Sequence, residues 1–276
     1  MRVVAPEALP VDAPLSTDEI DVVVSDRVED VDDALAIVHD GFVEAGYATA
    51  RASGRRMHPA YLNPGTVFAV ARIGDEAIGT AALIADGPFG LPSDRAFAEE
   101  NDAMRAESDE PLRECGSLAV RAPWRRHTRR IFVRAISALT RVAFDEFPDA
   151  PVPMAVSPES ERFYAAMVGS RTVAGPRPLY GAPAVLMRTS GRGVVEHCAL
   201  RLTSGQRRMG ALIGEADPAW LRDRRTHAPL PADWLRALED DRGVTGDLYA
   251  QIRLLAARHP DMLLDLLREA QGTIAA

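Results

Sequence analysis

The densest group of residues that could bind a reactant is a run of arginines between positions 115 and 144. This stretch holds no aspartate or glutamate, and its seven arginines are Arg121, Arg125, Arg126, Arg129, Arg130, Arg134 and Arg141. It therefore carries a formal charge of +7, which leaves −15 on the rest of a chain whose net charge is −8. A basic patch on an acidic protein attracts anions. The sequence predicts a site for a phosphate or an acidic partner here, with Arg134 and Arg141 the most easily explained as solvated surface charges.

All 32 basic residues of the 276-residue chain are arginine, and none is lysine. Codon bias in a GC-rich genome explains this composition, but its chemical consequences hold whatever the cause. Without lysine there is no Schiff base, so pyridoxal-phosphate and class I aldolase chemistry are excluded. The lysines of a P-loop and of a kinase strand are also missing. The acidic net charge argues against a general binder of nucleic acid or of anionic membranes.

The cysteines and histidines indicate no metal site. Cys115 and Cys198 are too few for a disulfide framework or a zinc cluster, and the six histidines lack metal-ligand spacing. Cys115 lies in an apolar stretch without a visible base partner, so we interpret it as an inert buried thiol. No apolar run reaches about 18 residues and no signal peptide is visible, so we expect a cytoplasmic protein without a membrane span.

Hydrophobic periodicity predicts the elements that position these residues. A β-branched strand at 21–25 precedes a helix that ends at Gly46, with Asp26 as its cap and Glu29 completing a capping box. The remaining predicted strands are 66–73, 76–85, 113–121, 152–156, 171–174 and 183–188, with helices at 93–106, 125–147 and 158–168. The order β-α-β-β-α-β-α-β-α-β-β predicts an α/β fold, a mixed sheet with helices on both faces.

Composition divides the chain into three parts. Residues 1–20 contain three prolines and no periodicity, which predicts a flexible arm. Residues 21–190 hold the α/β pattern, and residues 191–276 read as a helical C-terminal extension with Leu and Trp stripes. Those stripes are typical of a core or an interface, so a homo-oligomer through the C-terminal helices is one expectation.

Several segments resemble known acyltransferases. Leu118–Arg125 resembles the central strand of the GCN5-related N-acetyltransferase (GNAT) superfamily where it leads into the donor-binding helix, and Ser160–Gly169 resembles a later helix of that fold. Within the superfamily, N-acyl amino acid synthases are suggested by His39–Tyr47, Gly90–Asp94, Glu114–Val120 and Gly181–Leu186. Glu114–Val120 is also similar to a strand of acyl-homoserine lactone synthases, but Gly116 and Ser117 replace the Ser and Arg of that family.

The resemblance implies transfer of an acyl group, expected to be long, from an acyl carrier protein or acyl-CoA thioester to the amine of an amino acid or a similar amine. The thioester is a donor substrate, and no permanently bound cofactor is expected. Glu114 is the implied base and Tyr164 the implied acid toward the leaving thiolate. The backbone of Leu118, Ala119 and Val120 is expected to pair with the pantetheine amides.

The donor's phosphate would lie at residues 125–130, where the superfamily has a glycine-rich pyrophosphate loop. This chain has Arg125, Arg126, His127, Thr128, Arg129 and Arg130 instead. Glycines let backbone N–H groups close on phosphate oxygens. Their absence favours an acidic acyl carrier protein, whose phosphopantetheine has a single phosphodiester, or else a site that no longer catalyses.

The acyl-chain and acceptor sites are less visible in the sequence. The insertion 86–111 is placed to cover a long acyl chain, with candidate liners Phe89, Leu91, Phe97 and Met104. An amino-acid acceptor needs a cation for its carboxylate, and Arg177 and Arg95 are both possible. Two alternatives stay open: an acetyl-CoA-dependent N-acetyltransferase, and a catalytically silent module that binds acyl thioesters or carrier protein.

Overall fold

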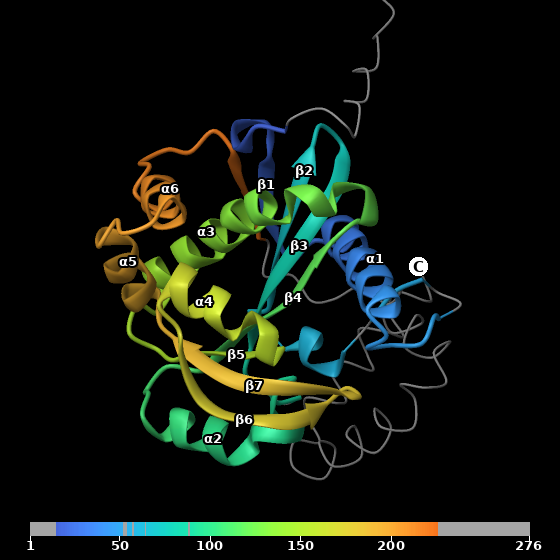
Figure 1. Ribbon diagram of the computed structural model, residues 1–276, viewed down its shortest axis with the longest axis vertical. Coiled ribbons are helices and arrows are strands. Elements are labelled where there is room, and N and C mark those ends of the chain that lie inside the picture. Colours follow the sequence, from blue (N-terminus) through green and yellow to red (C-terminus); the bar gives the residue numbers. More distant parts are fainter. Residues whose placement is uncertain (1–14, 52–53, 57, 64, 88, 226–276) are drawn as a thin grey trace, which may run out of the picture.

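The computed structural model describes residues 15–51, 54–56, 58–63, 65–87 and 89–225 (Figure 1). Its strands form two sheets. One has the order β4-β3-β2-β1-β8, with β1 (Asp21–Ser25), β2 (Val67–Ile73), β3 (Glu76–Ala85), β4 (Arg113–Val120) and β8 (Leu221–Arg224). The other has the order β5-β7-β6, with β5 (Val152–Val156), β6 (Arg171–Leu179) and β7 (Ala182–Thr189). The predicted mixed α/β fold is confirmed, although its strands divide between two sheets.

Six α-helices accompany the strands in the described part of the chain: α1 (Val28–Glu44), α2 (Asp94–Ala106), α3 (Thr128–Glu146), α4 (Glu161–Val168), α5 (Gly191–Ala199) and α6 (Ser204–Ile213). In Figure 1, α1 and α3 lie on opposite sides of the central strands. Alternation along β2 explains this layering, because successive side chains of a strand point to opposite faces. Ala69 and Ala71 pack with α3, whereas Phe68 and Val70 pack with α1.

A glycine brings α3 close to the sheet. A Cβ placed on Gly79 of β3 would lie 2.5 Å from Cγ2 of Ile131 on α3, closer than two carbon atoms approach without bonding. The absence of a side chain at position 79 therefore sets the distance between α3 and β3, and with it the position of the α3 N-terminus.

The two sheets meet at β4 and β5. These strands contact each other but share no ladder, so β4 is an edge strand of the five-stranded sheet. Beside them, α2 packs on β6, as Figure 1 shows, around buried Leu112, Phe97 and Leu186. An edge strand keeps unpaired backbone groups that a ligand can use.

The structure differs in detail from the sequence prediction at three places. The sequence predicts a flexible arm over residues 1–20, but Leu15, Thr17 and Ile20 are 4%, 2% and 0% exposed. Arg27, rather than Asp26, is the N-cap residue of α1, and no side chain caps that helix. The predicted extension begins with α5 and α6 packed on α3 and continues into β8, which pairs in parallel with β1. Its part beyond residue 225, with the predicted oligomer-forming helices, lies outside the described residues.

None of the described helices is both long enough and apolar enough to cross a bilayer.

Candidate active site

A cavity of about 140 Å³ opens between β4 and the three-stranded sheet, and we call it the polar cavity. From β4 it receives Glu114, Gly116 and Ser117. The segment before β2 supplies three further polar side chains, which are Arg56, His58 and Tyr61. Tyr180 comes from the turn between β6 and β7. Charged, phenolic and imidazole groups thus face one enclosed space.

Glu114 is 4% exposed and lines this cavity. Burial raises the pKa of Glu114 to about 7, against two hydrogen bonds from Ser93 that lower it. The Ser93 hydroxyl donates to Oε2 at 2.6 Å and the Ser93 backbone N–H donates at 2.9 Å. Asn101 donates in turn to the Ser93 hydroxyl at 2.8 Å, which fixes its direction. A carboxyl group that titrates near neutral pH is suited to accept a proton from a nucleophile.

His58 is held as a neutral donor. Burial, followed by the charges of Arg56 and Arg95, lowers the pKa of His58 to about 4. The backbone N–H of Ala60 donates to Nδ1 at 3.1 Å, so the ring proton lies on Nε2. Nε2 is 3.0 Å from the Tyr180 hydroxyl, which donates to the carbonyl of Pro92 at 3.1 Å. This chain of bonds leaves His58 no free lone pair for a general base, so it orients Tyr180 instead.

Strand β4 is distorted where it borders the polar cavity. Thr80 and Ala82 of β3 pair with Ala119 and Gly116, so two β4 residues oppose one β3 residue in a β-bulge. Ser117 in the bulge has φ of 54°, a conformation that costs a non-glycine residue about 1–2 kcal/mol. A hydrogen bond of 2.7 Å between its hydroxyl and that of Tyr61 holds it there. The bulge thus interrupts the β3–β4 ladder three to four residues after Glu114.

A second depression of about 320 Å³, the donor groove, continues from the bulge along β4. Its floor is Leu118, Ala119 and Val120, the strand residues predicted to pair with pantetheine. Gly41 of α1 forms part of the facing wall, and a Cβ there would lie 3.3 Å from the Ala119 Cβ. Two further residues line both the groove and the polar cavity, namely Phe42 and Tyr47. The two spaces are therefore neighbours that meet at the bulge.

The predicted phosphate-binding arginines fall into two groups. Arg125 borders the donor groove, where its guanidinium forms a two-pronged ion pair with Glu44 of α1. Arg126, Arg129 and Arg130 face away from the groove into a cavity of about 670 Å³. We call it the basic cavity, and it is also lined by His127 and by two arginines of α6, Arg207 and Arg208. Nitrogens of the buried His127 ring lie 3.0 and 3.4 Å from Arg126 and Arg130, which together with desolvation lower its pKa.

The remaining arginines of the run are structural. Arg134 is 2% exposed, donates to the carbonyl of Thr17 at 2.9 Å and stacks on Trp220. Arg141 donates to carbonyl groups at the end of α6, including that of Ile213 at 2.7 Å. Neither is the solvated surface charge that the sequence suggests. Both join the C-terminal segment to the α/β domain.

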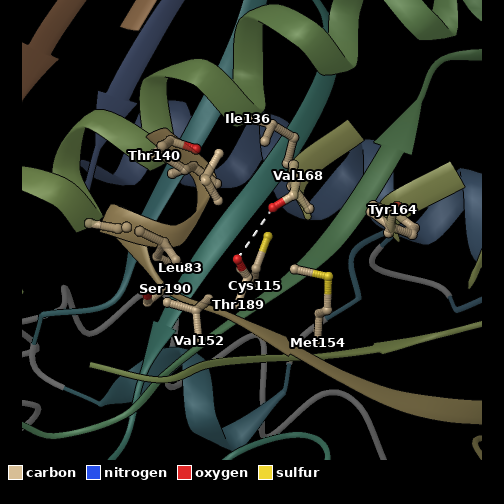
Figure 2. A pocket seen from close by; sticks show the side chains of 14 residues that line it. Leu83, Cys115, Ile136, Thr140, Val152, Met154, Tyr164, Val168, Thr189 and Ser190 are labelled. Atoms are coloured by element: carbon tan, nitrogen blue, oxygen red, sulfur yellow. Dashed lines mark hydrogen bonds between the residues drawn. The ribbon is translucent and has the colours of Figure 1, made fainter. Parts of the chain in front are cut away.

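An apolar pocket lies on the other face of β4 (Figure 2). Cys115 and Tyr164 line it with side chains of α3, β5 and β7, and its free volume is about 30 Å³. Burial, reinforced by Cys115, raises the pKa of Tyr164. Burial also raises the pKa of Cys115 to about 12, so this thiol stays protonated and is not a nucleophile. Glu114 and Cys115 are consecutive residues of β4, so their side chains point to opposite faces of the strand. Tyr164 lines the pocket on the Cys115 face and therefore borders a different cavity from Glu114.

The insertion residues proposed to line an acyl chain lie mostly in the core. Leu91, Phe97 and Met104 are 3%, 0% and 1% exposed and pack against the β6–β7 hairpin, whereas Phe89 is half-buried. Of the two arginines expected to bind a carboxylate, Arg177 is paired with Glu100 at 2.5 Å and Arg95 is exposed. The described residues include no group of three or more His, Cys, Asp and Glu side chains placed to hold a metal ion.

Several residues of the polar cavity have no role in the sequence-based prediction. Arg56, His58 and Tyr61 lie in a stretch that the sequence marks only as a loop, and Tyr180 lies 122 positions after His58. A cation, an imidazole and a phenol within six residues of a loop without periodicity are a usable signal, because binding groups concentrate on such loops.

Comparison with known proteins places this chain in a family. Residues 33–190 match the model of the N-acyl amino acid synthase FeeM family. The match identifies the chain as an N-acyltransferase, an enzyme that moves an acyl group to an amine. The match covers more than half of the chain, so the chain belongs to the N-acyl amino acid synthase FeeM family.

Solved structures share the fold. The structure of FeeM, an N-acyl amino acid synthase from uncultured soil microbes, superposes with a TM-score of 0.55 at 19% identity, covering 64% of this chain and 94% of FeeM. BjaI, a CoA-dependent acyl-homoserine lactone synthase solved with SAM and isopentyl-CoA, gives 0.51 at 18% identity, covering 76% of this chain and 95% of BjaI. No curated protein matches the sequence.

Proposed function

We propose that this enzyme transfers a long acyl chain from the thioester of an acyl carrier protein to the amine of an amino acid. One observation carries the proposal: the donor groove and the polar cavity meet at the β4 bulge, three residues along the strand from Glu114, which lines the polar cavity. A thioester laid along the groove would reach the bulge with its carbonyl, and an amine in the polar cavity would face that carbonyl.

The donor arm would bind as an added strand. β4 is an edge strand, and Leu118, Ala119 and Val120 line the groove, so pantetheine amides would pair with their free backbone groups. Gly41 matters here because any side chain at that position would narrow the groove against Ala119.

Starting from an ammonium, the reaction removes two protons from the nitrogen, one before it attacks and one as the amide forms; one proton is supplied to the leaving sulfur and the other is released to solvent. The Glu114 carboxylate would take a proton from the attacking ammonium, directly or through a water molecule. The nitrogen would then attack the thioester carbonyl, a C–N bond would form and the C–S bond would break. The leaving thiolate, with an ordinary pKa of about 8.5, would be protonated or stabilised. Tyr164 is the proposed donor, and because it lines the apolar pocket on the other face of β4, this role requires the sulfur to lie at the edge of β4 between the two faces. The raised pKa of Tyr164 keeps its hydroxyl protonated.

The apolar pocket behind β4 is the proposed site of the acyl chain. Its lining residues Leu83, Ile136 and Leu139 are buried carbon surfaces with no charged neighbour in the lining. Cys115 lines the pocket and directly follows Glu114 in β4, so a chain passing the edge of β4 would reach it. Its free volume of about 30 Å³ requires these side chains to move apart for a long chain.

The arrangement of the arginines supports a carrier protein as donor. Arg126, Arg129 and Arg130 line the basic cavity instead of the donor groove, which gives an acidic protein surface a wide cationic area to contact. Arg125 would contact the phosphodiester of phosphopantetheine only after leaving Glu44. An exposed ion pair contributes about 0–1 kcal/mol, so moving Arg125 from Glu44 to the phosphodiester would cost little free energy.

One experiment tests the proposal. The protein is incubated with acyl carrier protein or CoA thioesters of varied chain length and a pool of amino acids, and N-acyl products are identified by mass. Products from long-chain acyl carrier protein alone support the proposal. Products from acetyl-CoA would instead identify a short-chain N-acetyltransferase, and thioester binding without any product would identify a silent binding module.

A further inference from the structure

Arg56 is a buried cation that lacks a carboxylate partner among the described residues. It is 9% exposed, and its guanidinium carbon lies 4.6 Å from the centre of the Phe42 ring and 4.9 Å from that of Tyr180. Among the residues that the structure describes, no carboxylate forms an ion pair with it. Arg134, which is comparably buried, instead pairs with Asp18 at 3.1 Å and donates to a carbonyl.

Burying the Arg56 guanidinium costs free energy unless a bound ligand supplies the missing partner. Removing a guanidinium from water requires a partner anion or strong hydrogen bonds in return. Stacking between two aromatic rings returns only part of that free energy. The guanidinium nonetheless borders the polar cavity, where its donors are within reach of a bound molecule. A planar fork of donors at a cavity wall is suited to a carboxylate.

The surrounding charges leave this role to Arg56. Glu114 is the one acidic side chain lining the cavity in the described part of the chain, and its carboxyl is engaged by Ser93. His58 is neutral and occupied at both ring nitrogens. Arg56 and Glu114 both influence the pKa values of Tyr61 and Tyr180, so the two charges act within the same small space.

We propose that Arg56 binds the carboxylate of the amino-acid acceptor and thereby selects amino acids over simple amines. This inference rests on the proposed function, because it places the acceptor in the polar cavity. A carboxylate held at Arg56 would keep the amine of the same molecule inside the cavity that contains Glu114. Arg56 is then a substrate-binding residue that sets acceptor specificity.

The first test uses the wild-type enzyme and three acceptors with one acyl donor. They are the amino acid that reacts best in the pool, its carboxamide, and the amine that lacks the carboxyl group. The carboxamide and the amine should have KM values about 10- to 100-fold higher, the range for losing one hydrogen-bonded charge pair. Equal KM values for all three acceptors would overturn the inference.

The second test removes the cation. Arg56→Met should raise KM for the amino acid by about 10- to 100-fold and change KM for the carboxamide little, which abolishes the preference. Arg56→Lys keeps the charge without the planar fork and should give an intermediate preference. Arg95 is the matched rival, since it approaches the same Tyr180 ring at 5.9 Å but is exposed. If Arg95→Met abolishes the preference and Arg56→Met does not, the assignment to Arg56 is wrong.

Calorimetric titration separates the two proposals. The wild type, without donor, is titrated with the amino acid and with its carboxamide. If the protein binds the amino acid more tightly than its carboxamide but forms no product, the role of Arg56 is supported and the proposed acyl transfer is rejected. If it forms product but binds both compounds equally, the acyl transfer is supported and the role of Arg56 is rejected. If Arg56→Met fails to fold, Arg56→Lys takes its place in the comparison with Arg95→Met, and an unchanged preference in Arg56→Lys beside a lost one in Arg95→Met would overturn the assignment.

Discussion

The two faces of β4 near its bulge differ in almost every physical property. On one face, Glu114 looks into a cavity with a guanidinium, three phenols and an imidazole. On the other, Cys115 looks into a pocket lined almost wholly by carbon and sulfur (Figure 2). One strand thus separates a space suited to a polar acceptor from a space suited to an alkyl chain. The difference teaches that neighbouring positions in a strand can serve opposite reactants, because side chains alternate.

The largest effect should come from the polar face. Glu114→Gln should lower kcat/KM by about 10²- to 10⁴-fold, because an amide cannot accept the amine proton. In the wild type, kcat/KM should fall as pH drops below about 7, the pKa of Glu114. Steady-state rates between pH 5 and 9 measure both. An unchanged rate across that range would remove Glu114 from the mechanism.

Stability gives the same residue an independent test. The folded-state pKa of Glu114 lies above that of an unfolded glutamate, so the wild type binds the proton more tightly when folded. The resulting stability is present below about pH 4.5 and is lost as pH rises through about 7. The Glu114→Gln variant has no carboxyl group to titrate at this position and should not lose stability in this way. The urea concentration at which the variant unfolds should therefore rise relative to that of the wild type between pH 5 and pH 8.

Ser93 gives a graded version of this prediction. Ser93→Ala removes the 2.6 Å hydrogen bond that favours the ionised carboxylate, so the pKa of Glu114 should rise further. The acidic limb of the kcat/KM profile should move to higher pH, while the rate above it stays near that of the wild type. A uniform loss of rate without a shift would mean that Ser93 acts only by shaping the cavity.

The apolar face is tested by enlarging it. Leu139→Ala should cost about 2–5 kcal/mol of stability, typical of a large-to-small change in a core, and should favour longer acyl donors by making room in the pocket. Ile37→Ala is the matched control, because Ile37 is fully buried on the opposite side of the sheet. It should cost similar stability without altering chain-length preference. If both variants shift that preference alike, the pocket does not hold the chain.

Tyr164 should have a smaller effect. Tyr164→Phe removes the proposed proton donor and should lower kcat by about tenfold, less than the ~10²- to 10⁴-fold typical of general acid catalysis, because a thiolate is a good leaving group. The variant should regain rate with a thioester of a more acidic thiol, which leaves without a proton. Wild-type rates with the natural donor would instead make Tyr164 a packing residue of the apolar pocket.

The smallest effect concerns the basic cavity. Arg129→Gln together with Arg130→Gln should raise KM for the acyl carrier protein several-fold and flatten its dependence on salt concentration, because screened long-range attraction is lost. Arg162→Gln with Arg171→Gln removes the same charge from exposed positions elsewhere and should leave that dependence nearly unchanged. If KM depends on salt concentration equally in both variants, the basic cavity has no specific role in binding the donor.

Sequence patterns foretold the fold better than the site, for a physical reason. Strand and helix order follows from local periodicity and turn residues, and this order was recovered from β1 to β7. The polar cavity depends on contacts between distant segments, such as the hydrogen bond between His58 and Tyr180. No local pattern encodes that pairing.

The arginine run shows the same limit. Its positive charge is visible in the sequence, but the partners are not. Arg125 is paired with Glu44, 81 positions away, and Arg134 contacts Thr17, 117 positions away. Arg126, Arg129 and Arg130 line the basic cavity, whereas Arg134 and Arg141 hold the C-terminal segment in place. Helical spacing alone does not distinguish these two groups, because the distinction depends on how α6 packs on α3.

Strand β8 has a consequence for how the protein can be handled. It covers the outer edge of β1, whose Val22, Val23 and Val24 are almost fully buried. Without β8 that edge would present a β-branched, hydrophobic row of unpaired backbone groups, which is a template for intermolecular strand pairing. A fragment cut at the end of the family match, near residue 190, should therefore self-associate. One that ends after residue 225 should stay dispersed at the same concentration.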